Sequence, residues 1–273
     1  MYISIENKIF ITAVHIVARF AERRGATLPA LASILILAND DGIKMRATNL
    51  EVGIDLKLEG SVKTPGAVAV PAALLQQISS SLTPERTSTI EHIGELLLIT
   101  SGTGKFSLKT TPYDDFPSIP FPENPKHHLV IPASLLRTTM VSIASCASPS
   151  TIRPELASLF LSIERDVLTA AATDSFRLAE KRIMLKKTPA QLPSILVPVK
   201  NAGEFIRLLE GERDEIRLSF GKGKLSAEGH NFLITSRLVE GTSPDYRQIL
   251  PTEFATEATV LRAGHAYQQA SDW

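Results

Sequence analysis

The chain has 273 residues, enough for about two ordinary domains, and its 44% hydrophobic and 21% charged residues are typical of a globular protein with a core. Lysine plus arginine equals aspartate plus glutamate at 29 each, so net charge does not indicate nucleic-acid binding, and any DNA contact must come from local segregation of charge. Cys146 is the only cysteine, which excludes an internal disulfide. With no secretory signal in residues 1–10 and no apolar run of about 18 residues, we expect a cytoplasmic protein.

The first elements predicted in chain order are a short strand and an amphipathic helix. The apolar positions of the helix recur at helical spacing: Ile9, Phe10, Ala13, Ile16, Val17 and Phe20. Its other face carries polar and basic residues: Lys8, Thr12, His15, Arg19 and Arg23. Arg24 and Gly25 are expected to end this helix, because glycine is common directly after a helix.

Strands are expected next at residues 33–38, 44–48 and 52–58, and Asn39-Asp40-Asp41-Gly42 predicts a hairpin turn between the first two. A second helix is predicted after Val70-Pro71, because proline fits the first turn of a helix. Its apolar positions are Leu74, Leu75, Ile78 and Leu82. Strands at 89–91, 96–100 and 105–110 follow.

The same order of elements recurs in the second half. Helices are predicted after Pro132 and after Pro198. The apolar positions of these two helices are Leu135, Leu136, Met140, Ile143 and Ala144, and then Phe205, Ile206 and Leu209. Strands are expected at 159–163, 167–173, 215–220, 224–228 and 232–238.

The chain also repeats its own sequence. Residues 28–36 match residues 153–161, and 47–49 match 172–174, both 125 positions further on. Val70-Pro71 matches Val197-Pro198 at an offset of 127, and 115–120 resembles 245–251 at 130. The predicted fold class is therefore α+β, with tandem domains that each pack two helices on antiparallel sheets. We expect domains at 1–122 and 126–251, and 252–273 as the first element of a truncated third domain, because 258–263 parallels 128–133.

The reactive residue types of the sequence form no recognisable catalytic constellation. Asp114, Asp115, Asp174 and Asp245 are candidate metal ligands, but turn or ion-pair roles are favoured. His127-His128 lacks further ligands at metal spacing, and Cys146 fits a small buried position. The run 221–224 joins two strands and lacks the spacing of a phosphate-binding loop. No cofactor is expected.

Basic residues on or beside the helices are the candidates for DNA contact. They are Arg19, Arg23, Arg24, Arg137 and Lys200. A basic helix face is commonly only solvated, whereas residues placed against phosphates attract DNA without reading its sequence. Acidic neighbours, among them Glu22, Glu204 and Glu210, dilute this charge, so any attraction is expected to be modest.

Eight segments of the chain form a characteristic set: Thr27-Leu28-Pro29, Ala47-Thr48-Asn49-Leu50-Glu51, Val70-Pro71-Ala72, Tyr113-Asp114-Asp115-Phe116-Pro117, Ile152-Arg153-Pro154-Glu155-Leu156, Ala172-Thr173-Asp174-Ser175-Phe176-Arg177-Leu178-Ala179, Val197-Pro198-Val199-Lys200 and Gly241-Thr242-Ser243-Pro244-Asp245-Tyr246-Arg247. In these segments the chain resembles the bacterial DNA polymerase sliding clamp family (the beta subunit of DNA polymerase III). The resemblance covers essentially the whole chain, and the family has this repeat three times.

The resemblance implies a non-catalytic processivity factor of DNA replication. Two family chains pair head to tail into a ring that encircles double-stranded DNA without sequence preference. The partners implied are the polymerase alpha subunit, clamp-loader subunits, and other polymerases and repair proteins, which insert a hydrophobic peptide into a pocket. Carried over by motif, half of that pocket consists of Leu156, Thr173, Ser175, Arg177, Leu178, Pro244, Arg247 and Ile249. Among DNA-facing residues, Arg24 carries over most clearly.

The sequence departs from the family pattern at three places. Ser175-Phe176 stands where the family usually has Gly-His, and Ala73 stands where a basic residue is common. The third repeat stops early, so we expect this chain not to close a ring dimer in the family's way. Two alternatives remain at this stage: a repeat-built scaffold that binds no DNA, and a metal-dependent nuclease using Asp174 and Asp245.

Overall fold

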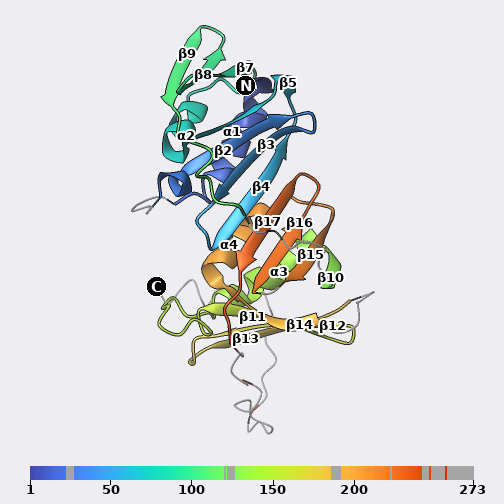
Figure 1. Cartoon of the computed structure of the whole chain (residues 1–273). Helices are drawn as coiled ribbons and strands as arrows, with labels where there is room; N and C mark the ends of the chain where they lie inside the picture. Colours follow the sequence, from blue (N-terminus) through green and yellow to red (C-terminus); the bar gives the residue numbers. More distant parts are fainter. Residues whose placement is uncertain are drawn as a thin grey trace. The chain divides into compact units, whose positions relative to one another are not determined.

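The computed structural model describes residues 1–22, 28–119, 121, 127–185, 192–221, 223–241, 246 and 256. Residues Met1–Thr242 form one compact unit, and Ser243–Trp273 form a second. All helices and strands of the described residues lie in the first unit (Figure 1). None of these helices is long and apolar enough to cross a membrane.

The first half of this unit runs from residue 1 to residue 119. Its helices are α1 (Asn7–Val17), a short 3-10 helix (Pro29–Ala32) and α2 (Ala72–Ser80). Its strands are β1 (Tyr2–Glu6), β2 (Ser33–Asn39), β3 (Gly42–Thr48), β4 (Val52–Leu58), β5 (Ser61–Thr64), β6 (Gly66–Pro71), β7 (Thr87–Ile93), β8 (Leu96–Ser101) and β9 (Gly104–Lys109).

The second half repeats this order, although its described residues contain no counterpart of β5 or of the 3-10 helix. Its helices are α3 (Ala133–Ala144) and α4 (Val199–Leu208). Its strands are β10 (His127–Pro132), β11 (Ser158–Glu164), β12 (Val167–Thr173), β13 (Leu178–Met184), β14 (Leu192–Pro198), β15 (Glu215–Gly221), β16 (Lys224–Glu228) and β17 (Phe232–Arg237).

Strand order confirms the repeat that the sequence predicts. The first half contains the orders β1-β7-β8-β9 and β4-β3-β2-β6, and the second contains β10-β15-β16-β17 and β13-β12-β11-β14. These are the same two four-stranded arrangements, with β5 added beside β1 in the first half. The fold is α+β with antiparallel sheets, as predicted, whereas the residue bounds of the domains stay a prediction.

A single sheet joins the two halves. Strand β17, at the edge of the second half, pairs antiparallel with β4, at the edge of the first, and this pairing creates a sheet of eight strands (Figure 1). Ile234 lies opposite Ile54 in this seam, and both side chains are fully buried. The halves therefore share backbone hydrogen bonds as well as apolar contacts.

Each half packs a pair of helices against its sheets. Helix α1 contacts α2 and strands of both sheets of the first half, and α3 contacts α4 and strands β10 to β13. Pro71, Pro132 and Pro198 each occupy the position directly before a helix, with φ between −51° and −56°. Proline suits this position because its φ is fixed and it has no N–H to satisfy. The prolines thus precede the helices instead of lying in their first turns.

Several predictions differ from the structure. Helix α1 ends at Val17 and not at Arg24-Gly25, because Arg19 and Phe20 donate backbone hydrogen bonds to the residues three positions earlier, and Phe20 turns into the core. Arg19 therefore follows the helix. Leu74, predicted as a core position of α2, is 49% exposed, and the prediction omitted strands β5, β6, β13 and β14.

Candidate functional site

A tight turn between β12 and β13 carries several predicted pocket residues. Ser175 has a φ of 78°, a left-handed conformation that is unusual for a residue with a side chain. The turn is fixed because the Thr173 hydroxyl accepts a hydrogen bond from the Ser175 N–H at 3.1 Å. Asp174 Oδ1 accepts two more, from the N–H groups of Phe176 at 2.9 Å and Arg177 at 2.7 Å.

The same turn, with the same hydrogen bonds, stands 125 residues earlier between β3 and β4. Leu50 has a φ of 72°, and its N–H donates to the Thr48 hydroxyl at 3.0 Å. Asn49 Oδ1 accepts from the N–H groups of Glu51 at 3.1 Å and Val52 at 2.9 Å. The internal repeat therefore extends to individual hydrogen bonds, so each half can be used to interpret the other.

Asp174 is held as a carboxylate inside its turn. Its Oδ2 accepts hydrogen bonds from Arg177 Nε at 3.0 Å and Nη2 at 2.8 Å. The backbone N–H of Arg177, its guanidinium and the N–H of Phe176 lower the pKa of Asp174 from 3.8 to about 2. The ion-pair role expected for Asp174 is confirmed. Within the described residues, no group of three His, Cys, Asp or Glu side chains is arranged to hold a metal.

The remaining described pocket residues lie at the same end of one sheet. Thr173 lies opposite Leu178 in the pairing of β12 with β13. Strand β11 pairs with the other side of β12, and its first residue, Ser158, lies opposite Pro198 on β14. Leu156 is buried just before β11, and Leu178 is half-buried at the start of β13. A small cavity of about 180 Å³ at this end is lined by residues that include Pro154, Ala157, Pro198 and Lys200. The turn brings Thr173, Ser175, Arg177 and Leu178 together, and Leu156 lies next to Ala157 of the cavity, which none of these five residues lines.

In the first half, the equivalent place is filled by the chain itself. Ile119 lies so close to Gly53 that a Cβ added there would be 2.8 Å from Ile119 Cγ2 and 3.2 Å from the Thr48 hydroxyl. Gly53 is the counterpart of Leu178 at the offset of 125, and Ile119 is the counterpart of Ile249 in the match of 115–120 with 245–251. The first half therefore contains an internal model of one part of the predicted pocket, in which Ile119 takes the place of the pocket residue Ile249.

The predicted DNA-contacting residues differ in their surroundings. Arg19 lies beside the second half, with its Nε 3.3 Å from Glu204 Oε2, and Glu204 also pairs with Arg207. Arg137 pairs with the exposed Glu210 at 3.2 Å. Lys200, at the start of α4, is exposed and forms none of the ion pairs found among the described residues. Of these three residues, Lys200 is the most available to contact phosphates, whereas Arg19 forms an ion pair between the two halves.

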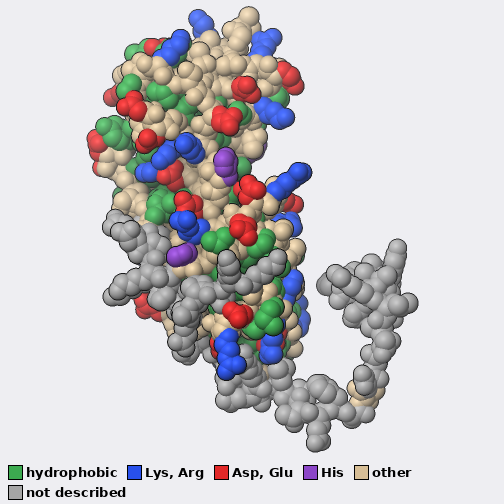
Figure 2. Space-filling model, turned by 90° about the vertical axis from the view of Figure 1, so that its right-hand side faces the viewer, with side chains coloured by type: hydrophobic (Ala, Val, Ile, Leu, Met, Phe, Trp, Pro, Cys, Tyr) green, Lys and Arg blue, Asp and Glu red, His purple; other side chains and the backbone are tan. Residues whose placement is uncertain are grey.

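Five predicted site residues lie outside the described residues: Arg23, Arg24, Pro244, Arg247 and Ile249. Over the face shown in Figure 2, lysine and arginine side chains are interspersed with aspartate and glutamate. This mixed surface agrees with the zero formal net charge, and any contact with phosphates must therefore be local.

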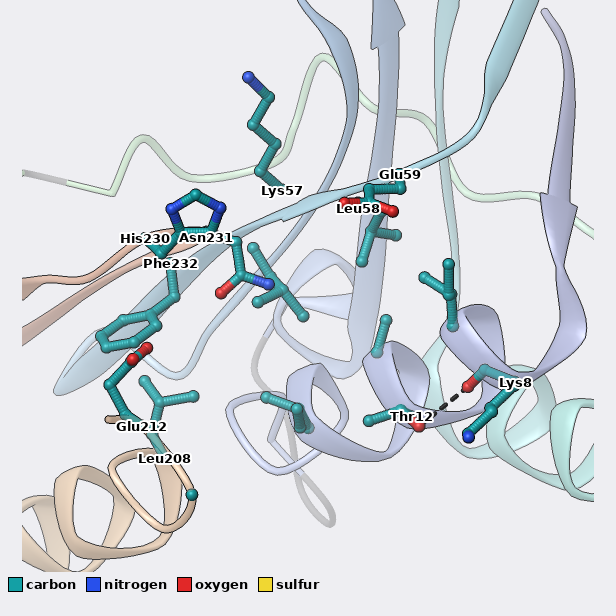
Figure 3. A pocket seen from close by; sticks show the side chains of 15 residues that line it. Lys8, Thr12, Lys57, Leu58, Glu59, Leu208, Glu212, His230, Asn231 and Phe232 are labelled. Carbon is teal, nitrogen blue, oxygen red and sulfur yellow. Dashed lines mark hydrogen bonds between the residues drawn. The ribbon is translucent and has the colours of Figure 1, made fainter. Parts of the chain in front are cut away.

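A larger groove lies between the two halves, at the other end of β4 from the Leu50 turn. It has a volume of about 890 Å³. Figure 3 shows Lys8 and Thr12 of α1 on one side of it, and Glu212 and Phe232 on the other. Residues from both halves thus form its walls, and the groove is separate from the predicted peptide pocket.

Comparison with known proteins accounts for both halves. Residues 1–120 match the DNA polymerase III beta subunit N-terminal domain, and residues 130–245 match the central domain of the same subunit. The beta sliding clamp of Pseudomonas aeruginosa is 30% identical over 259 residues, which cover 92% of this chain and 68% of that protein. The chain belongs to the bacterial beta sliding clamp family.

Other beta sliding clamps agree with this assignment. That of Vibrio cholerae is 32% identical over 83% of this chain, and that of Streptomyces coelicolor is 28% identical over 96%. A crystal structure of the Pseudomonas aeruginosa beta subunit superposes with a TM-score of 0.86 at 29% identity, covering 93% of this chain and 69% of that one. The chain spans 62% to 70% of the length of these three curated clamps.

Two features of this clamp chain were missed by sequence reasoning. The partnership of Arg19 with Glu204 was missed because it joins residues 185 positions apart in different repeats. The packing of Ile119 over Gly53 was also missed. The sequence contained a signal for the second feature, because the match at an offset of 130 aligns Ile119 with Ile249.

Proposed function

We propose that this chain is part of a DNA sliding clamp that encircles duplex DNA and tethers the replicative polymerase to it. The proposed role is that of a cytoplasmic accessory subunit without catalysis or cofactor. The observation that carries the proposal is the eight-stranded sheet, in which the last strand of one repeat pairs with the edge strand β4 of the previous one. A structure that adds repeats edge to edge in this way suits a closed ring.

The free edge of the second half fits this proposal. Strand β13 is the counterpart of β4, and on its outer side it pairs with no strand within the described residues. An unpaired edge strand presents N–H and C=O groups that favour pairing with another strand. In the proposed ring, a further repeat would pair with β13 as β17 pairs with β4. The head-to-tail dimer is expected on the same grounds.

DNA contact in this proposal is weak and made by the helix sides of the repeats. Lys200 and Arg137 would supply local positive charge on α4 and α3, with Arg19, Arg23 and Arg24 after α1. Such contacts are made to phosphates and carry no sequence information. Enclosure of the duplex, and not tight binding, would keep the clamp on DNA.

The peptide pocket is proposed at the end of the β11–β13 sheet. The buried Leu156 and half-buried Leu178 would hold apolar anchors of the partner peptide beside Thr173 and Ser175. Packing of Ile119 against Gly53 in the first half supports this assignment, because their counterparts Ile249 and Leu178 are both predicted pocket residues. Polymerase, clamp-loader and repair proteins are the proposed partners.

Lys200 offers a direct test of DNA contact. The chain and its Lys200→Glu variant would be titrated with a short labelled duplex at several salt concentrations, with binding followed by fluorescence anisotropy. The logarithm of the association constant falls linearly with the logarithm of salt concentration. We expect this decline to be shallower for the variant, with the magnitude of the slope reduced by about one.

Lys109→Glu is the matched control, because Lys109 is also an exposed lysine but lies on strand β9, outside the helices. It should leave the slope unchanged. Equal slopes for the chain and for Lys200→Glu would contradict DNA contact at α4, and would favour the alternative of a scaffold that binds no DNA.

A further inference from the structure

Two free strand edges of the unit are counterparts of the two strands that form its internal seam. Strand β9 takes the same place in the first half as β17 in the second, and β13 takes the same place as β4. On their outer sides, β9 and β13 pair with no strand within the described residues. They lie at opposite ends of the unit (Figure 1), so one copy cannot pair its own two edges.

The internal seam defines the register that a pairing of β9 with β13 would have. Leu96 and Lys224 each follow a two-residue turn, and they pair with Lys109 on β9 and with Arg237 on β17. This equivalence aligns β9 with β17 at an offset of 128. Because β13 follows β4 at an offset of 125, every pair of the seam has a counterpart pair on the two free edges.

The apolar side of the two edges fits this register. Phe106 on β9 would lie opposite Ala179 on β13, as Ile234 lies opposite Ile54 in the seam. The two isoleucines are fully buried, whereas Phe106 and Ala179 are half-buried and pack against the margin of the core. Pairing of the two edges would cover both side chains, and burial of apolar surface favours association.

The charged side of the two edges fits the same register. Lys105 on β9 would lie opposite Glu180 on β13, as Leu233 lies opposite Asp55 in the seam. Both side chains are exposed, and Lys105 forms none of the ion pairs found in the described part of the chain. Opposite charges directly across an antiparallel pair stabilise it, and like charges destabilise it.

We propose that β9 of one copy of this chain pairs antiparallel with β13 of a second copy, in the register of the internal seam. The inference rests on the proposed function, in which a further repeat pairs with β13, and it names that repeat as the first half of another copy. A second copy is favoured as the partner because β9 is the counterpart of the strand that already covers β4. The contact is heterologous, since each copy contributes a different strand.

Sedimentation velocity of the full chain over a range of concentrations tests this pairing. We expect the unsubstituted chain to associate. Phe106→Asp blocks β9 and Ala179→Asp blocks β13, because each places a charge on the apolar side of the pair, and each should raise the dissociation constant by more than about tenfold. An equimolar mixture of the two variants should form dimers with one copy of each, since each variant keeps the edge that the other lacks.

Val141→Asp is the matched control, because Val141 is 47% exposed on α3, and it should leave association unchanged. A charge exchange tests the register without altering the apolar side. Lys105→Glu and Glu180→Lys should each raise the dissociation constant about three- to fivefold, and the double variant should recover most of the affinity. No recovery in the double variant would contradict the register.

Two further results would overturn the inference. Self-association of Phe106→Asp alone, or of Ala179→Asp alone, as strong as that of the unsubstituted chain would show that like edges pair. An unsubstituted chain that stays monomeric at all concentrations would exclude the contact. If such a monomer still shows the Lys200-dependent salt slope, the proposed DNA contact stands and only this inference is wrong. Loss of both results would contradict both proposals.

Discussion

Asp174 and Asn49 hold the same turn in the two repeats, but only Asp174 carries a charge. Both side chains accept the same two backbone hydrogen bonds through Oδ1. Because an amide oxygen suffices for these bonds, we expect Asp174→Asn to preserve the turn and to lose only the ion pair with Arg177. The first half thus provides a natural control for a substitution in the second.

The pH dependence of stability should reveal this difference. The folded pKa of Asp174 is about 2, below the ordinary 3.8, so its charged form stabilises the folded chain. This contribution is fully present above about pH 4 and is lost as the pH falls towards 2. Urea unfolding at several pH values should show a smaller loss of stability between pH 4 and 2 for Asp174→Asn. Identical profiles for both proteins would contradict the assignment.

Glu204 connects the two repeats because its carboxylate forms ion pairs with both Arg19 and Arg207. Glu204→Gln keeps the shape of the side chain but removes its charge, leaving the partly buried Arg19 without its partner. We expect a loss of about 1–2 kcal/mol in the free energy of unfolding, because the arginine keeps some solvent contact. Denaturant midpoints measure this loss. Glu95→Gln, which breaks an exposed pair with Lys109, should change stability by less than about 0.5 kcal/mol.

At the scale of elements, hydrophobic patterning predicted most of the fold. Strands β4, β12 and β16 begin and end where the aliphatic runs indicate, and helices α2, α3 and α4 each directly follow the proline that predicts them. The repeat in sequence correctly implied a repeat in topology. Because both copies share these signals, an error in one half could be corrected from the other.

The elements that were missed have physical reasons. The residues of β13 alternate between partly and fully exposed and show no buried stripe, so hydrophobicity gives no signal for this edge strand. Helix α1 was predicted too long because Arg19 and Phe20 continue the helical spacing. In the structure, a tighter turn after Val17 places the side chain of Phe20 in the core. At the site, motif similarity located the turn residues, but the exposure of Phe176 depends on the left-handed Ser175, which no periodicity reveals.

Gly53 tests the packing of the internal pocket model. Gly53→Ala places a methyl group 2.8 Å from Ile119 and 3.2 Å from the Thr48 hydroxyl, so the segment that carries Ile119 must move. We expect a loss of about 1–3 kcal/mol in the free energy of unfolding. Gly203→Ala in α4 is the control, because the nearest atom to the added methyl is 3.8 Å away and alanine favours a helix. Urea unfolding should show opposite shifts for the two variants.

At the scale of the whole unit, the shared sheet makes the two repeats energetically dependent on each other. Opening the first half exposes one edge of β17, and opening the second exposes one edge of β4. Separating these two strands breaks the backbone hydrogen bonds between them and exposes the apolar area that the seam buries. We therefore expect residues Met1–Thr242 to unfold as one cooperative unit, although they contain two copies of a domain.

Ile234→Ala tests this cooperativity, since Ile234 is fully buried in the seam opposite Ile54. Truncation of a buried isoleucine costs about 2–5 kcal/mol. NMR signals of Ile54 in the first half and Ile163 in the second should report the same urea midpoint, lowered equally by the substitution. Two separate transitions, with only the signal of Ile163 shifted, would show instead that each repeat is stable without its neighbour and that the seam couples them weakly.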